Sequence, residues 1–158
     1  MWALRWQPVV FAAAPLELAP THIDVPSITL IFPYPDWLLA AADQHWQARG
    51  FEVIDHFSLD PDQGDTRAIY ALSPEAALER IRGRWQNREA DAYLITGTGL
   101  PTLRIIAQLS ETLPGPVLSS NLCLAWATLR EAGIDLGERK PAASMPLLGG
   151  WQGDIERL

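Results

Sequence analysis

Three short polar stretches each follow a buried-looking run, and together they could bind a small anion. They are residues 33–36 (Pro-Tyr-Pro-Asp), 96–99 (Thr-Gly-Thr-Gly) and 119–121 (Ser-Ser-Asn). If the preceding runs are parallel strands, the stretches lie at one edge of the sheet, where ligands of open α/β sheets bind. The second stretch offers only hydroxyls and backbone amides. It can therefore hold an anion, but it has no thiol, imidazole or carboxylate that moves a proton.

Residue types in the second and third stretches favour a carboxylate or phosphate. Glycines permit a positive φ and close approach of a ligand, while hydroxyl and amide groups donate hydrogen bonds. Both stretches lead into expected helix N-termini, which attract negative charge. The predicted substrate-binding residues are Gly97, Thr98, Gly99, Ser119, Ser120 and Asn121. A structural alternative stays open, in which Thr98, Ser120 and Asn121 cap helices and the glycines only turn the chain.

Tyr34 is the one catalytic candidate. A phenol at a strand end, between Pro33 and Pro35, could donate a hydrogen bond or shuttle a proton. A tyrosine that only packs is the alternative. Nucleotide binding is a weaker hypothesis, because Thr102 stands where a dinucleotide motif needs its third glycine and no Walker A pattern occurs.

Histidine and cysteine show no pattern of a metal site. His22, His45 and His56 fall in the N-terminal segment, on an expected helix and on an expected strand, and we interpret each as structural. Cys123 is the only cysteine. It sits in an expected first helical turn, but its leucine neighbours predict a buried, inert thiol. We expect no metal and no cofactor.

Composition limits the partners and the location. The chain has 12 Lys and Arg against 19 Asp and Glu, a formal net charge of −7. Nucleic acid and anionic membrane surfaces are therefore poor partners. No apolar run approaches the roughly 20 residues that span a bilayer. A single cysteine fits a reducing compartment, so the cytoplasm is the expected location.

Strands alternating with helices predict the fold class. Strands are expected at 27–32, 51–57, 92–96 and 116–120, and helices at 36–49, from 73 to about 88, from 100 to about 113, and from about 121 until Gly133. Short connections call for parallel pairing with right-handed crossovers. The prediction is an α/β three-layer sandwich with a four-stranded parallel sheet, flavodoxin-like, in the order 2-1-3-4.

The chain divides into three predicted parts. Four prolines in residues 1–26 predict an irregular N-terminal arm. Residues 27–134 form the α/β domain, and residues 135–158 form a C-terminal tail. Within the domain, the polar stretch after the second strand holds no predicted element. The helix from 100 is expected to pack through Leu103, Ile106 and Leu109 or Leu113.

Several stretches in their order and spacing carry a family resemblance. They are "ITLIFPYPDWL", "ARGFEVI", "LSPEAALERI" and "ADAYLITGTGLPTLRIIAQLSETLPGPVLSSNLCLAWATLREAGI". Together they resemble the C-terminal half of the aspartate/glutamate racemase superfamily, in the branch of maleate cis-trans isomerase and arylmalonate decarboxylase. The resemblance covers about residues 27–134.

That resemblance implies two pseudo-symmetric halves with a substrate carboxylate between them and no cofactor. In the family, a cysteine thiolate moves a proton or attacks the substrate, while hydroxyls and amides stabilise an enediolate-like intermediate. Tyr34 and the Ser-Ser-Asn turn keep the family pattern, but Gly97 occupies the cysteine position. The first half is not represented, unless residues 1–26 are a remnant of it.

The expected function is therefore a racemase-superfamily domain that binds a small carboxylic acid. It is homologous to isomerases and decarboxylases (lyases), with impaired or no activity alone. The alternative is a non-catalytic binding or assembly module that forms a homodimer or pairs with a separate N-terminal half. A truncated gene product without a selected function is a third interpretation.

Overall fold

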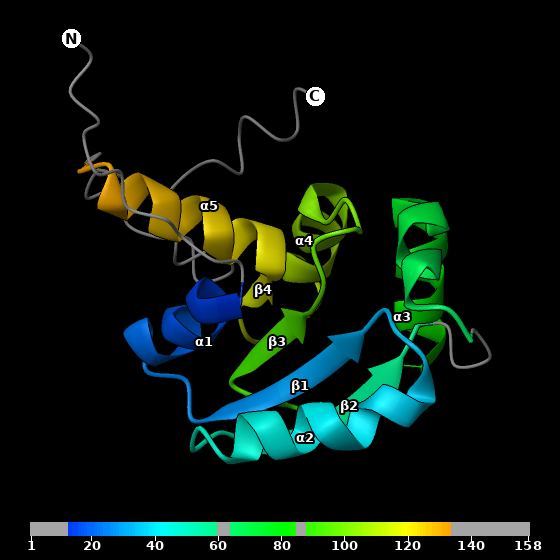
Figure 1. The fold of residues 1–158 in the computed structure, drawn as a ribbon, viewed down its shortest axis with the longest axis horizontal. Helices are drawn as coiled ribbons and strands as arrows, with labels where there is room; N and C mark the ends of the chain where they lie inside the picture. Colours follow the sequence, from blue (N-terminus) through cyan, green and yellow to red (C-terminus); the bar gives the residue numbers. More distant parts are fainter. Residues whose placement is uncertain (1–12, 60–63, 85–87, 134–158) are drawn as a thin grey trace, which may run out of the picture.

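The computed structural model describes residues 13–59, 64–84 and 88–133, and these form a layered α/β domain (Figure 1). The elements are α1 (Ala13–His22), β1 (Ser27–Phe32), the 3-10 helix η1 (Asp36–Leu38), α2 (Leu39–Gln47), β2 (Glu52–Ser58), the 3-10 helix η2 (Thr66–Ala71), α3 (Pro74–Arg84), β3 (Ala92–Ile95), α4 (Leu103–Ser110), β4 (Val117–Ser119) and α5 (Ser120–Glu131). No helix among the described residues is long and apolar enough to cross a membrane.

All four strands are parallel and lie in the order β2-β1-β3-β4. The predicted fold class and strand order are confirmed. β1 and β3 are the central strands, and every residue of β3 is buried. Such strands are covered on both faces, which explains why their sequences are continuous apolar runs rather than alternating ones.

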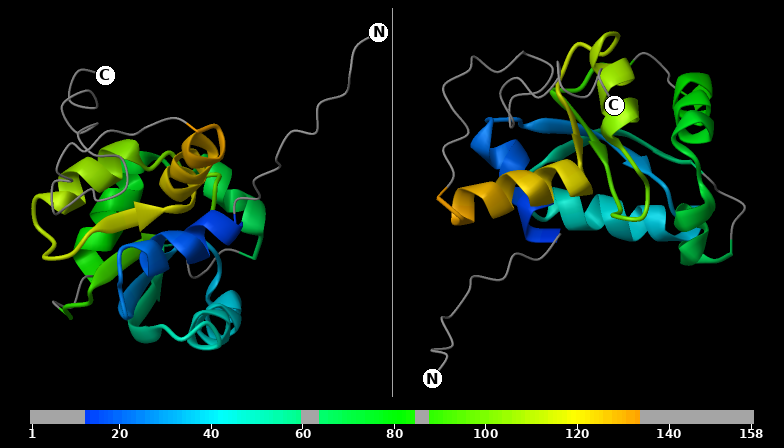
Figure 2. Two further views of the ribbon diagram at one scale, coloured as in Figure 1. Left: turned by 90° about the vertical axis from the view of Figure 1, so that its left-hand side faces the viewer. Right: turned by 90° about the horizontal axis from the view of Figure 1, so that it is seen from above.

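Helices cover both faces of the sheet. Figures 1 and 2 show α1, α2 and α5 on one face and α3 and α4 on the other. α1 packs against α5, and α3 packs against α4. This distribution follows from right-handed crossovers, because the chain leaves β1 toward one side of the sheet and returns past it to reach β3.

Side-chain hydrogen bonds join the amino ends of the two central strands. Asp91, just before β3, accepts a hydrogen bond from the Ser27 backbone N–H at 3.1 Å, and the Asp91 N–H donates to Ser27 Oγ at 3.0 Å. These bonds align β1 with β3 from the start. The opposite, carboxyl ends of both strands therefore emerge side by side.

The N-terminal segment differs from the prediction, because part of the expected irregular arm is helix α1. Pro15 falls in the first turn, where a missing N–H costs little, and Pro20 falls in the last turns. Leu16 and Ala19 are buried, so packing against α5 stabilises a helix that local proline content argues against. Residues 1–12, 60–63, 85–87 and the tail expected at 135–158 lie outside the described residues.

Two further expectations within the domain were wrong. The stretch after β2 contains η2, where no element was predicted. In α4 the expected packing of Ile106 and Leu109 is confirmed, but Ile105 is buried as well, and Leu103, which was expected to pack, is 41% exposed. At the start of α4 the buried residue is Thr102 rather than Leu103. The hydroxyl groups of Thr102 and Ser119 form a hydrogen bond of 2.8 Å.

The burial pattern of α4 predicts unequal effects of two truncations. Ile106→Ala should lower the free energy of unfolding by about 2–5 kcal/mol, because a fully buried side chain leaves a cavity. Leu103→Ala, on the same helix, should cost less than about 1 kcal/mol. Urea unfolding measures both, and equal losses would contradict this placement of α4.

Candidate active site

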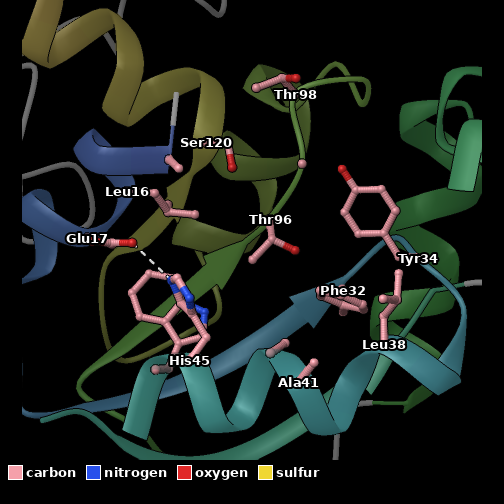
Figure 3. A pocket seen from close by; sticks show the side chains of 14 residues that line it. Leu16, Glu17, Phe32, Tyr34, Leu38, Ala41, His45, Thr96, Thr98 and Ser120 are labelled. Carbon is pink, nitrogen blue, oxygen red and sulfur yellow. Dashed lines mark hydrogen bonds and ion pairs between the residues drawn. The ribbon is translucent and has the colours of Figure 1, made fainter. Parts of the chain in front are cut away.

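A pocket of about 440 Å³ opens at the carboxyl ends of β1 and β3. Its lining residues are Ala13, Leu16, Glu17, Phe32, Tyr34, Leu38, Ala41, Ala42, His45, Trp46, Thr96, Gly97, Thr98 and Ser120 (Figure 3). β1 and β3 are the strands from which the chain leaves in opposite directions. The pocket therefore lies at the topological switch point, as expected for a ligand site in such a sheet.

Four of the predicted site residues line this pocket: Tyr34, Gly97, Thr98 and Ser120. Hydrogen bonding of Thr96 N–H to Ile31 carbonyl oxygen at 3.1 Å continues the β1–β3 pairing up to the turn. The chain then reverses at Gly97, whose φ is +86°. Ser120 is the first residue of α5, whose N-terminal dipole favours negative charge.

Gly97 is also a point of close contact. A Cβ at this position would lie 2.6 Å from Ile69 Cδ1 and 2.8 Å from the Tyr34 hydroxyl oxygen. Both the φ and the contacts thus require glycine here. The same contacts place the Tyr34 hydroxyl directly beside the turn.

The other three predicted residues, Gly99, Ser119 and Asn121, do not line the pocket. Ser119 is fully buried and caps α5 by accepting a hydrogen bond from Leu122 N–H at 3.1 Å. Asn121 Nδ2 donates to the carbonyl oxygens of Thr98 and Leu100 at 3.2 and 3.1 Å. Ser119 and Asn121 therefore stabilise this region by hydrogen bonds without lining the pocket.

Gly99 serves packing as well, because a Cβ there would lie 2.9 Å from both Ile69 Cγ2 and Tyr70 Cε1. Of the three residues that the structural alternative named as caps, none has that role: Ser119 caps α5, and the N-cap position of α4 is Thr102.

Thr96 was not among the predicted substrate-binding residues, although it opens the second polar stretch and lies centrally among the lining side chains (Figure 3). Its side chain is 7% exposed, and its Oγ1 has no hydrogen-bond partner among the described residues. A buried hydroxyl without a partner costs about 1–3 kcal/mol. Its position at the end of a buried strand, just before Gly97, was the available signal in the sequence.

One wall of the pocket comes from α1, which the sequence did not reveal. Glu17 on α1 accepts from His45 Nε2 at 3.0 Å and pairs with Arg49 Nε at 2.9 Å. The neighbouring wall is formed by Leu38 of η1 and by Ala41, Ala42 and His45 of α2. These four are partly or fully exposed, and Trp46 is the residue of α2 that is buried.

Electrostatics define what Tyr34 can do. Burial raises the pKa of the Tyr34 phenol above its usual value, and nearby Tyr70 adds to the shift. The phenol is therefore protonated at neutral pH, so it can donate a hydrogen bond and is a poor general base.

The remaining reactive groups lie elsewhere. Burial raises the pKa of the Cys123 thiol to about 12, so it stays protonated and unreactive at neutral pH. The His22 ring contacts the Trp126 ring at a tilt of 44°, with ring centres 5.1 Å apart, and His56 pairs with Asp43 at 2.6 Å. The described residues contain no group of three or more His, Cys, Asp and Glu side chains that could hold a metal.

Comparison with known protein families gives a match over most of the chain. A family model described as arylmalonate decarboxylase matches residues 19–144. Maleate isomerase from Alcaligenes faecalis is 27% identical over 143 residues, which cover 90% of this chain and 54% of that protein. The chain thus spans about half the length of this relative.

Solved structures show the same fold. Maleate isomerase from Pseudomonas putida S16, a cysteine-to-alanine variant with maleate, superposes with a TM-score of 0.75 at 21% identity, covering 90% of this chain and 56% of that one. A Nocardia farcinica maleate cis-trans isomerase mutant with a covalently bound succinylcysteine intermediate gives 0.73 at 21%, covering 87% and 54%. Arylmalonate decarboxylase gives 0.67 at 17%, covering 90% and 60%.

The geometry at Gly97 predicts that even a methyl group is not tolerated there. Gly97→Ala should lower the free energy of unfolding by about 1–3 kcal/mol, because it combines a positive φ with steric overlap. Gly83→Ala is the matched control: nothing lies near its Cβ position in α3, so stability should be unchanged or rise by up to about 1 kcal/mol. Urea unfolding of both variants checks this, and equal stability of the two would refute the close contact at Gly97.

Proposed function

The chain belongs to the arylmalonate decarboxylase family, and we propose that its pocket binds a small carboxylic acid without turning it over by itself. The observation that carries the proposal is the grouping of the Tyr34 phenol, the unpartnered Thr96 hydroxyl and the Ser120 hydroxyl around one pocket. Each can donate a hydrogen bond to a carboxylate oxygen.

Backbone amides of Gly97 and Thr98 complete the proposed set of donors. A turn with a positive φ, next to a helix N-terminus, is an arrangement that suits anions. Gly99, Ser119 and Asn121 belong to the proposed site only indirectly, because they fix the shape of this turn. A relative of the same fold has been solved with maleate, a small carboxylate, which supports the ligand class.

We propose that the chain does not turn over the bound acid, because glycine stands where the family has its reactive cysteine. One relative forms a covalent succinylcysteine intermediate, whereas the chain has one cysteine, Cys123, which is buried. The resemblance aligns the family's cysteine with Gly97, where Ile69 and the Tyr34 hydroxyl occupy the space a side chain would need. Tyr34 would then act as a hydrogen-bond donor to the bound acid rather than as a proton acceptor.

Removing the Thr96 hydroxyl tests the proposed site. Thr96→Val should weaken binding of the best ligand among maleate, phenylmalonate and phenylacetate by about tenfold to a hundredfold, since one hydrogen bond to a charged group is lost. Thermal stability should not fall, because an unpartnered hydroxyl is removed. Calorimetric titration and thermal melting measure the two effects, and an assay for isomerisation and decarboxylation should show no turnover by the wild type.

Thr29→Val provides the matched control. Thr29 Oγ1 is equally buried and unpartnered among the described residues, but Thr29 does not line the pocket. This variant should leave ligand affinity unchanged. Equal weakening by both variants, or no binding of any of the three acids to the wild type, would rule out the proposed site.

A second candidate function, assembly with another copy or with a separate lobe, is favoured by two exposed aromatic residues. Trp37 in η1 is 66% exposed and Tyr70 in η2 is 74% exposed. Both segments follow the carboxyl ends of adjacent strands, β1 and β2.

If two copies assemble through Trp37 and Tyr70, the molecular mass in solution should increase with protein concentration. Light scattering should show a dimer that Trp37→Ser with Tyr70→Ser shifts toward the monomer, because interfaces bury aromatic anchors. Leu18→Ser, which changes an exposed leucine on α1, is the control and should leave the mass unchanged. A monomer at all concentrations, with no second lobe supplied, would argue against self-assembly.

A further inference from the structure

We propose that this pocket selects monocarboxylates with an apolar body and rejects dicarboxylates, and that Glu17 is the residue that imposes this selectivity. The inference rests on the proposed function, because it names the class of acid that the same site takes. It differs from what the names of the relatives suggest, since maleate and arylmalonates both carry two carboxylates.

The charges of the lining residues support selectivity for monocarboxylates. None of the 14 described residues around the pocket is lysine or arginine, and Glu17 is the only carboxylate among them. A first carboxylate finds the donors of Tyr34, Thr96 and Ser120. A second carboxylate would have to give up its hydration beside a like charge, which is unfavourable unless a cation compensates it.

Arg49 is the nearest candidate for such a cation, but it is already engaged. Its Nε lies 2.9 Å from Glu17 Oε2, and its Nη1 donates to the backbone oxygen of His45 at 3.1 Å. Arg49 itself does not line the pocket. Arg49 therefore compensates the charge of Glu17 from outside the lining, and no cation among the described lining residues faces a second carboxylate.

Apolar side chains make up much of the remaining wall. Leu16, Phe32, Leu38 and Trp46 line it together with the two alanines of α2. The volume of about 440 Å³ is within the usual range for small-molecule sites and accommodates a phenyl ring. An aryl or branched alkyl group would bury apolar surface here, which favours binding.

Three residues of this wall precede the span of the family model. The family model begins at residue 19, whereas Ala13, Leu16 and Glu17 come from the first turns of α1. Figure 3 shows Glu17 reaching the pocket from α1 and meeting His45 of α2. α1 therefore begins before the span of the family model and ends within it.

Phenylacetate and phenylmalonate, which differ by one carboxylate, form the test pair. With the full chain at neutral pH and constant ionic strength, calorimetric titration should give a dissociation constant about tenfold lower for phenylacetate than for phenylmalonate. Glu17→Gln keeps the length and an acceptor oxygen of the side chain but removes its charge. This variant should reduce the preference to about threefold or less, while thermal melting verifies that it is folded.

Glu79→Gln is the control, because Glu79 is exposed on α3, on the opposite face of the sheet; it should keep the wild-type preference. If the wild type binds phenylmalonate as tightly as phenylacetate, the inference is overturned and the proposed function still stands. This outcome does not depend on whether Glu17→Gln folds. An unchanged preference in folded Glu17→Gln would overturn the role of Glu17. Absence of binding by either acid would overturn the proposed function and the inference together.

Discussion

The backbone at Gly97 is the constraint on which the pocket depends. With a φ of +86° and no Cβ, it lets Ile69 from η2 and the hydroxyl of Tyr34 approach the same point. Parallel pairing of β1 with β3 delivers Tyr34 and Gly97 to that point from the two central strands. A side chain at position 97 would strain the backbone and displace the ends of Ile69 and Tyr34, so the close packing of this turn depends on glycine.

A second feature, the pairing of Glu17 with His45 and Arg49, connects α1 to α2 across the pocket. The ion pairs are partly exposed, and such pairs contribute little to stability. Their effect is to place a carboxylate at one wall while its guanidinium partner stays outside the lining. The pocket thus has hydroxyl groups at the strand ends and an otherwise apolar wall that includes one carboxylate, Glu17.

Some features of the site could be found in the sequence and others could not. The Pro-Tyr, Thr-Gly-Thr and Ser-Ser turns were visible because residues that break strands and begin helices are local signals. Thr96 was counted as the end of a strand, since nothing local reveals whether its hydroxyl has a partner. Ser119 and Asn121 carry hydrogen-bond donors just as Ser120 does, and only the direction in which α5 leaves β4 separates a residue that stabilises the turn from one that lines the pocket.

The sequence by itself determined the α/β class, the strand order and the edge of the sheet where polar turns gather, because apolar periodicity and short connections allow few topologies. Tertiary structure alone decided that prolines at 15 and 20 lie within a helix, that η2 covers the Gly97 turn, and that Glu17 faces the pocket. Each of these depends on contact between segments distant in the chain. Packing energy between such segments outweighs local preference, and a single sequence carries no direct record of it.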